Sequence, residues 1–256
     1  MPGADHTDLA AAADALEAQL RAAGQPERAE PERRYLKIDL EVFGTAVGDV
    51  RRAVRTHRRA QPNPTREGIV ALAVELWGRP VFECRLAAVE LLVTEAGRLE
   101  TGDLALVERL VRHAGTWALV DPLAIHVAAP VVERHHESAR LVLEMWAGDD
   151  SFWVRRSALL ALLPALRRGD GDFETFGRYA DAMLDEREFF IRKAIGWVLR
   201  ETGRRRPDLV REWLQPRIHR ASGVTVREAL KPLADDARAH LLALRSGRAV
   251  VAGPQT

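Results

Sequence analysis

One helix opening recurs along this chain at an almost constant interval. Each copy has apolar or aromatic residues leading into an apolar helical run, and four of the five copies have arginine at the fourth position; the copies are residues 82–85, 117–120, 152–155, 189–192 and 224–227. Their fourth positions are 35, 35, 37 and 35 residues apart. A unit of that size cannot bury its own apolar face, so this period predicts a helical solenoid in which neighbouring units cover one another.

The remaining sequence also reads as helices separated by short breaks. Alanine and leucine recur at helical spacing over 9–23, 27–34 reads as a charged connector around Pro31, and 61–65 is a turn that ends with Thr65 as an N-cap. Strand-like alternation between hairpin turns is absent from the sequence. We therefore predict an all-α fold of antiparallel helix pairs. Its expected parts are an N-terminal helix and connector at 1–30, a repeat domain at 31–246 and a flexible tail at 247–256.

Composition limits the cellular compartments in which such a chain is expected. The sequence is 47% hydrophobic, but it has no run of about 18 apolar residues, so no membrane span is expected. The first eight residues lack a basic segment followed by an apolar one, which argues against a secretory signal. Cys84 is the single cysteine, so an internal disulfide is excluded. We expect a cytoplasmic protein in which Cys84 is a small core residue.

Charge is unevenly distributed along the chain. The whole sequence carries a net charge of +1, but residues 151–231 hold 17 basic and 11 acidic side chains, a net charge of +6. The other residues hold 21 basic and 26 acidic side chains, a net charge of −5. A basic C-terminal half is typical of a surface that binds a polyanion, although arginine-rich helix surfaces are also ordinary.

Aligning the repeats groups several polar residues at one position. The residues directly after the fourth position are Leu86, Asp121, Arg156, Lys193 and Glu228. Side chains four residues apart share a helix face, so Trp117 lies one turn before Asp121 and Trp197 one turn after Lys193. If this face is the inner wall, it holds a carboxylate, two cations and two indoles on neighbouring helices, which indicates a lined cleft.

Each of these residues also has a purely structural interpretation. Asp121 precedes Pro122, a pair common at helix starts, so it could be an N-cap. Arg156 could form an inter-repeat ion pair with Asp121, the two tryptophans could fill helix packing seams, and Lys193 could be solvated.

Other candidates are weaker. His135 and His136 are metal-ligand types, but adjacent residues diverge on a helix, so we predict no metal site. Fingerprints for nucleotide binding or serine hydrolysis are missing, so no cofactor is expected. The run Arg204, Arg205 and Arg206 could contact phosphate or be a solvated helix end. The loop before Thr225, which contains Ser222, could hold a phosphate on its backbone N–H groups or provide an ordinary cap.

At these residues the chain resembles the DNA alkylation repair family of HEAT-like-repeat DNA glycosylases, the AlkD-like group. The resemblance runs from about residue 35 to 244, and its most specific stretches are 116–121, 152–156, 189–197 and 222–230. The family's cleft has a tryptophan four residues before an aspartate, an arginine on the next repeat and a second tryptophan on the following repeat. Trp117, Asp121, Arg156 and Trp197 occupy those positions.

The resemblance implies a fold and an activity. The fold is a right-handed α-solenoid whose concave groove binds duplex DNA, and the activity is excision of cationic N3- and N7-alkylated purines without base flipping. Asp121, Trp117, Arg156 and Trp197 would then be catalytic. The expected DNA contacts are Lys193, Arg204, Arg205, Arg206, Ser222, Thr225 and Arg227. The expected partner is double-stranded DNA containing alkylated purines, with no obligate protein partner, and the protein is expected to be a monomer.

One segment departs from the family pattern. Members often carry an Asn-His-Phe-like segment followed by Gly-x-x-x-Pro, whereas residues 37–48 of this chain lack that proline. Two other functions remain open on the sequence. One is a non-catalytic DNA-binding solenoid, which would show salt-sensitive duplex binding without base release. The other is a protein-interaction scaffold in which the two tryptophans anchor a peptide.

Overall fold

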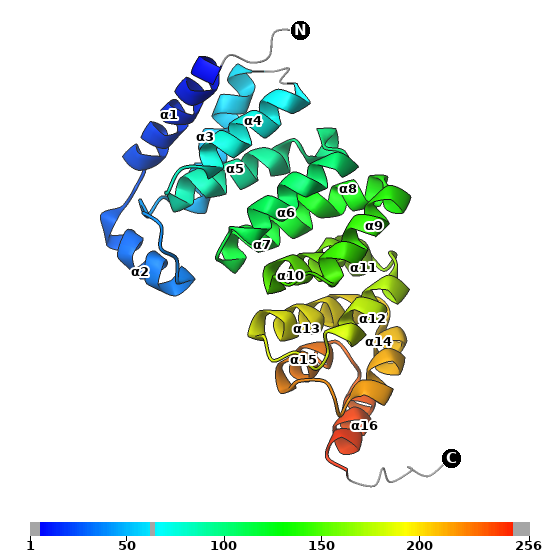
Figure 1. Ribbon diagram of the computed structural model, residues 1–256. Helices are drawn as coiled ribbons and strands as arrows, with labels where there is room; N and C mark the ends of the chain where they lie inside the picture. The colour runs from blue at the N-terminus through cyan, green and yellow to red at the C-terminus, as the bar shows by residue number, and fades with distance from the viewer. Residues whose placement is uncertain (1–5, 62–64, 248–256) are drawn as a thin grey trace. The chain divides into compact units, whose positions relative to one another are not determined.

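The computed structural model describes residues 6–61 and 65–247 of the chain, and these residues are built from helices (Figure 1). They contain no strand beyond one isolated bridge between Glu41 and Val81. The predicted all-α class is thus confirmed. The described helices include none long and apolar enough to cross a membrane.

The chain divides into two compact units, Met1–Ala139 and Arg140–Thr256, and the division falls within α9 (His136–Ala147). The first unit contains α1 (His6–Ala22), α2 (Pro26–Leu36), α3 (Val47–Ala60), α4 (Arg66–Trp77), α5 (Phe82–Thr94), α6 (Leu104–Arg112), α7 (Trp117–Pro122), a π-helix (Leu123–Ala128) and α8 (Ala129–Arg134), with 3-10 helices at Ala96–Arg98 and Thr101–Asp103. The second contains α10 (Phe152–Ala161), α11 (Leu163–Arg168), α12 (Phe173–Ala182), α13 (Phe189–Gly203), α14 (Pro207–Leu214), a 3-10 helix (Gln215–Arg217), α15 (Gly223–Ala229) and α16 (Asp235–Arg245).

The five repeated openings are helix starts. Four of them begin at the first residue of the repeated motif, as α5, α7, α10 and α13, and α15 begins one residue before its motif. Consecutive members contact each other inside each unit: α5 packs on α7, α10 on α13, and α13 on α15. The repeat period read from the sequence therefore corresponds to a repeat of packed helices.

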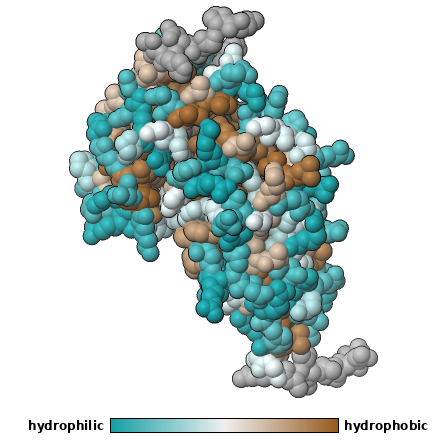
Figure 2. All heavy atoms as spheres, viewed as in Figure 1, coloured by the Kyte–Doolittle hydropathy of each residue, from teal (hydrophilic) through white to brown (hydrophobic). Residues whose placement is uncertain are grey.

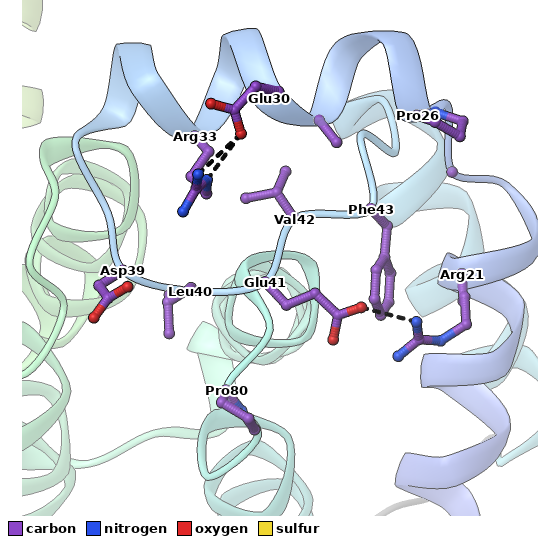
Figure 3. Close-up of a pocket in the computed structure, with 12 residues that line it drawn as sticks. Arg21, Pro26, Glu30, Arg33, Asp39, Leu40, Glu41, Val42, Phe43 and Pro80 are labelled. Atoms are coloured by element: carbon purple, nitrogen blue, oxygen red, sulfur yellow. Dashed lines mark hydrogen bonds and ion pairs between the residues drawn. The ribbon is translucent and has the colours of Figure 1, made fainter.

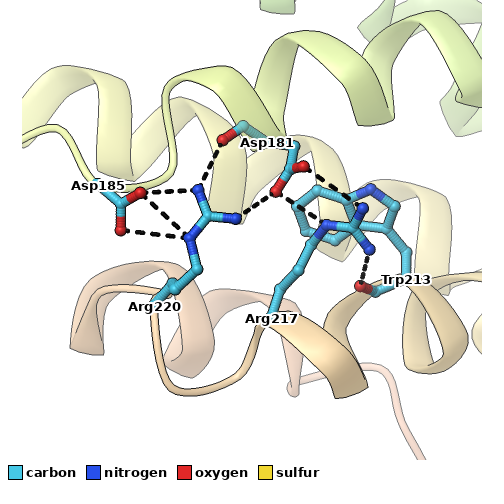
Figure 4. Close-up of polar contacts among 5 residues, drawn as sticks. All are labelled: Asp181, Asp185, Trp213, Arg217 and Arg220. Carbon is cyan, nitrogen blue, oxygen red and sulfur yellow. Dashed lines mark hydrogen bonds and ion pairs between the residues drawn. The ribbon is translucent and has the colours of Figure 1, made fainter.

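Polar contacts between helices repeat with the same period. In the first unit, the guanidinium of Arg66 binds the carboxylate of Asp103, 37 residues away, at 2.8 and 2.9 Å. In the second unit, Arg217 binds Asp181 at 3.0 Å and Arg220 binds Asp185 at 2.7 Å, across 36 and 35 residues (Figure 4). The hydrogen bond from Arg217 lowers the pKa of Asp181. These ion pairs join side chains about one repeat apart, and Asp185 and Arg220 occupy equivalent positions of successive repeats.

Glu83 organises the loop that precedes α3. Its carboxylate is fully buried and accepts hydrogen bonds from the backbone N–H groups of Phe43, Gly44 and Thr45, at distances from 2.8 to 3.1 Å. Gly44 adopts φ +76, and a Cβ at that position would lie 2.2 Å from the carbonyl oxygen of Gln25. The loop therefore requires glycine there and a carboxylate beneath it.

The fold tests two local expectations. The segment 27–34 is not a connector but part of α2, which Pro26 begins and Lys37 ends in the left-handed conformation at φ 54. Thr65 is the N-cap of α4, as predicted, and accepts a hydrogen bond from the Gly68 N–H at 3.1 Å. The rest of the predicted turn, 62–64, and the tail from 248 lie outside the described residues. In the first unit α1 packs on α3, α4 and α5.

Candidate functional site

Trp117 and Asp121 lie one turn apart on the short helix α7. Thr116 caps this helix and accepts a hydrogen bond from the Ala118 N–H at 3.4 Å. Trp117 and Asp121 are half-buried, whereas Leu119 and Val120 between them are completely buried. The buried pair fixes α7 in the first unit and leaves one face, with the indole and the carboxylate, accessible. Asp121 stands in the last turn of α7, so the N-cap interpretation of Asp121 is wrong.

The chain changes its helical geometry directly after Asp121. Pro122 has no N–H to donate, and residues Leu123–Ala128 form a π-helix in which the Ala129 N–H donates to the carbonyl of Ala124, five residues back. Such π segments are rare and occur frequently at functional sites. Leu123, Ala124 and Val127 are fully buried, so the altered segment is anchored in the core.

Tyr35 is an aromatic neighbour that the sequence did not indicate. It lies at the end of α2, 72% of the residue is exposed, and its ring meets that of Trp117 edge to face at 6.1 Å between centroids. Nothing in the repeat register links α2 to α7, because α2 precedes the first repeated opening. An exposed phenol beside a half-buried indole gives the first unit an aromatic surface near Asp121.

Arg156 is buried, with 3% of the residue exposed. Its guanidinium donates a hydrogen bond to the carbonyl of Phe190 at 2.5 Å and lies 5.8 Å from the centroid of the Phe190 ring. These contacts connect α10 to the start of α13. Arg156 thus has a clear structural role within the second unit.

Lys193 and Trp197 share a face of α13 and are both half-buried. The ammonium of Lys193 binds a carboxylate oxygen of Glu228 at 2.9 Å. Lys193 and Glu228 are 35 residues apart and equivalent in the repeat register, so the contact supports that register. Gly196 makes the close approach of α13 and α15 possible, since a Cβ there would lie 2.9 Å from the Cβ of Glu228.

The arginine run lies between α13 and α14. Arg204 lies 3.6 Å from the carboxylate of Glu201, and Arg206 donates to the carbonyl of Asp170 at 2.8 Å. Arg205 is exposed, and its side chain lies over Gly169. Arg204 and Arg205 are the accessible members of the run, whereas Arg206 is half-buried.

The small-residue loop before α15 forms a helix cap. Ser222 accepts a hydrogen bond from the Thr225 N–H at 3.1 Å, and the Thr225 hydroxyl donates to the carbonyl of Arg192 at 3.0 Å. Both hydroxyls therefore hold α15 in place. Arg227, on the same helix, is exposed.

Two arginines of the repeated motif, Arg155 and Arg192, brace neighbouring segments of the second unit. Arg155 binds both carboxylate oxygens of Glu186, at 3.0 and 2.8 Å, and also donates to the carbonyl of Asp149. Arg192 donates to the backbone carbonyl of Glu186 at 2.7 Å. Both therefore fix the segment before α13.

A cavity of about 760 Å³ lies in the first unit between the end of α1, α2 and the loop before α3 (Figure 3). Its wall mixes charges: Arg21 binds Glu41 at 2.9 Å and lies over the ring of Phe43, and Arg33 binds Glu30. None of the residues that the sequence predicted for catalysis or DNA binding lines this cavity.

No group of three or more His, Cys, Asp or Glu side chains able to hold a metal ion occurs among the residues that the structure describes. Cys84 is completely buried, as predicted, and burial raises the pKa of its thiol to about 12.

Comparisons with known proteins show a family model that matches this chain and solved structures with a similar fold. A family model described as DNA alkylation repair enzyme matches residues 16–233. The fold is similar to that of a predicted DNA alkylation repair enzyme from Enterococcus faecalis, with a TM-score of 0.75 and 22% identity over 83% of this chain and 97% of the other. It is also similar to AlkD2 from Streptococcus mutans, with a TM-score of 0.58 and 17% identity over 79% of this chain and 98% of the other.

A third solved structure, smu.31 from Streptococcus mutans UA159, has a TM-score of 0.52 and 18% identity over 78% of this chain and 91% of the other. None of the curated proteins matches the chain. The solved structures establish the fold, and the family model spans most of the sequence. The chain therefore belongs to the DNA alkylation repair enzyme family.

Proposed function

We propose that this protein is a DNA glycosylase that hydrolyses the N-glycosidic bond of cationic N3- or N7-alkylated purines in duplex DNA. The observation that carries the proposal is the accessible face of α7, where Asp121 follows Trp117 by one turn and Tyr35 adds an exposed ring. A carboxylate beside aromatic rings suits a reaction in which both the substrate and the developing sugar are cationic. Family membership supports alkylated DNA as the substrate.

The carboxylate of Asp121 would act on the sugar. Alkylation gives the purine a positive charge, so the base leaves as a neutral molecule and needs no strong acid for its departure. As the bond from C1′ to the base nitrogen breaks, positive charge develops on the sugar, and a nearby carboxylate stabilises it. Water then adds at C1′, and its proton passes to a base, for which Asp121 is the candidate.

The aromatic rings would select the cationic lesion. A cation over an indole or phenol face gains roughly 0.5–2 kcal/mol, depending on how far it is desolvated. We assign this role to Trp117 in the first unit and Trp197 in the second, because the repeat register makes their helices equivalent. Capture of the lesion by such surfaces requires no base flipping.

The proposal includes the predicted right-handed solenoid with a concave groove for duplex DNA, in which Lys193 lies towards the DNA backbone and Arg156 supports the helices beneath. The repeated helix starts and the polar contacts between successive repeats inside each unit support a repeat architecture. DNA is the proposed partner, and a monomer without a protein partner is the proposed active form.

Release of 7-methylguanine from a methylated duplex tests the chemistry. Asp121→Asn keeps the side-chain shape but removes the charge, so we expect the single-turnover excision rate to fall by about a hundredfold or more. Duplex affinity should stay within a few-fold, because the change affects the transition state and not the phosphate contacts. Asp49→Asn, the same substitution on the surface of α3, is the matched control and should excise like the wild type.

One observation favours a second candidate, a non-catalytic DNA-binding protein. Arg156 is buried against Phe190, and Lys193 is paired with Glu228, so both cations already serve structural contacts. This alternative predicts salt-sensitive duplex binding by the wild type without base release. A protein-interaction scaffold would show neither. An excision rate unchanged in Asp121→Asn would remove Asp121 from the mechanism.

A further inference from the structure

Three cations converge on one buried carboxylate where α13 meets α15. Lys193 lies 2.9 Å from one oxygen of Glu228, Lys231 lies 3.0 Å from the other, and Arg200 also binds the second oxygen. Burial alone raises the pKa of Glu228, but the hydrogen bonds and charges of these cations outweigh it and lower the pKa to about 2. Glu228 is therefore ionised and holds its three partners together.

A second carboxylate on α13 repeats the arrangement. Glu201 lies 3.0 Å from Arg200, 3.3 Å from Arg167 and 3.6 Å from Arg204. Because Arg200 contacts both carboxylates, the two groups form one network, which we call the α13–α15 basic cluster. It contains Lys193, Lys231, Arg200, Arg167 and Arg204 around Glu201 and Glu228, a net charge of +3.

The positive and negative groups of the cluster lie at different depths. The side chains of Glu201 and Glu228 are each 10% exposed, whereas those of Lys231 and Arg204 are 56% and 64% exposed. The carboxylates therefore lie beneath the cations, and the cluster presents positive charge to solvent. Hydrophilic residues cover much of the second unit on the face shown in Figure 2.

The cluster opens onto a concave surface of suitable size. A cavity of about 480 Å³ is lined by Arg200, Arg204, Lys231 and Pro232. Pro232 packs against Gly203, where a Cβ would lie 2.8 Å from the proline ring, so this wall is fixed. Guanidinium and ammonium groups around such a space recognise phosphate oxygens by charge-assisted hydrogen bonds.

A purely structural role does not explain the number of cations. One cation neutralises one carboxylate, and the other members of the cluster repel each other at short range and lose side-chain entropy. A bound polyanion would relieve that repulsion. The buried carboxylates would then act as positioning residues that preorganise the cations.

We propose that the α13–α15 basic cluster is a binding site for backbone phosphates of duplex DNA, with Arg204 and Lys231 contacting phosphate directly and Glu201 and Glu228 holding the cations in position. The choice of DNA as the source of the phosphates rests on the proposed function. The cluster includes none of Asp121, Trp117 and Trp197, so we assign it a role in affinity and not in chemistry.

The test is the salt dependence of binding to an undamaged duplex, followed by fluorescence anisotropy of labelled DNA between 50 and 200 mM KCl. Each lost phosphate contact lowers the slope of log affinity against log salt by about 0.9, so the double variant Arg204→Ala/Lys231→Ala should lose nearly two units of slope. Its affinity at low salt should fall by about tenfold or more.

The matched control removes the same charge elsewhere in the second unit. Arg178 on α12 and Arg211 on α14 are 52% and 41% exposed and pair with Glu144 and Asp208, outside the cluster. Arg178→Ala/Arg211→Ala should keep the wild-type slope. Equal slopes for the two double variants would overturn the site. If the first double variant is poorly folded, Lys231→Gln alone, at an exposed side chain, should still lower the slope by about 0.9.

The results also separate this site from the proposed chemistry. Loss of slope in a protein that releases no 7-methylguanine would support the phosphate site and contradict the glycosylase function. Base release by a wild type whose slope is the same as that of Arg204→Ala/Lys231→Ala would support the function and reject the site. A wild type that binds no duplex at 50 mM KCl would contradict both.

Discussion

Glu228 shows how single residues of this protein combine burial with charge. Its carboxylate is buried where α13 packs on α15, yet three cations keep it ionised and lower its pKa to about 2. Removing one member of a buried ion-pair network destabilises the fold, because the remaining charges lose their partner.

Glu228→Gln should therefore reduce stability in a pH-dependent way. The folded-state pKa lies below the ordinary value of 4.5, so the stabilisation from ionisation is present above pH 4.5 and is lost as the pH falls towards 2. We expect the wild type to melt at a higher temperature than Glu228→Gln at pH 6, and the difference to shrink between pH 4.5 and 2. Glu212→Gln, on the exposed surface of α14, is the control and should show no such change. A difference that is the same at every pH would contradict the assignment.

The sequence predicts some features of the candidate site and does not reveal others, for physical reasons. The spacing of four residues placed Trp117 and Asp121 on one face correctly, because both lie on the same short helix. Tyr35 could not be found this way, since its contact with Trp117 joins elements with no common register. The burial of Arg156 was also missed, because it depends on Phe190 on another helix.

At the scale of helices, the close packing of α13 on α15 depends on one glycine. A Cβ at Gly196 would lie 2.9 Å from the Cβ of Glu228 and 3.1 Å from the backbone of Thr225. Backbone atoms cannot move aside as a flexible side chain would, so the two helices would have to separate. That separation would also disturb the ion pair of Lys193 with Glu228.

Gly196→Ala should destabilise the protein by about 1–3 kcal/mol, the usual cost of overpacking, even though alanine favours helices. Chemical denaturation followed by circular dichroism measures the change. Gly148→Ala, whose nearest contacts would lie at 3.9 Å, is the control and should be close to neutral. An equal effect of the two substitutions would show that helix contact at Gly196 is not limiting.

Helix boundaries followed the sequence where apolar spacing defined them and failed where charge dominated. The repeated openings were located to within one residue, because each carries an apolar face that its neighbour buries. The sequence predicts a connector over 27–34, where the structure has α2, because this segment has almost no apolar face and contains Pro31. Ion pairs from Arg33 and Arg34 to Glu30, at helical spacing, help α2 form nevertheless.

At the scale of the whole molecule, the chain consists of two compact units, each with its own buried side chains. The family model crosses the division between them, and so do the candidate residues, with Asp121 in the first unit and Trp197 in the second. The sequence shows the period of the repeats, but the period alone does not reveal where the chain divides into two units. In repeat proteins, stability is local because each helix pair interacts mainly with its neighbours.

A single core substitution should therefore destabilise the unit that contains it more than the other unit. Leu92 on α5 and Leu160 on α10 are both completely buried, and truncation to alanine at such sites costs about 2–5 kcal/mol. In native-state hydrogen exchange of the full chain, Leu92→Ala should lower amide protection mainly in residues 6–139, and Leu160→Ala mainly in residues 140–247. The two variants serve as controls for each other, because the substitution is identical and only the unit differs. Equal loss of protection in both units from either variant would mean that the molecule unfolds as one cooperative body, and that damage to one unit removes the residues of both from the proposed reaction.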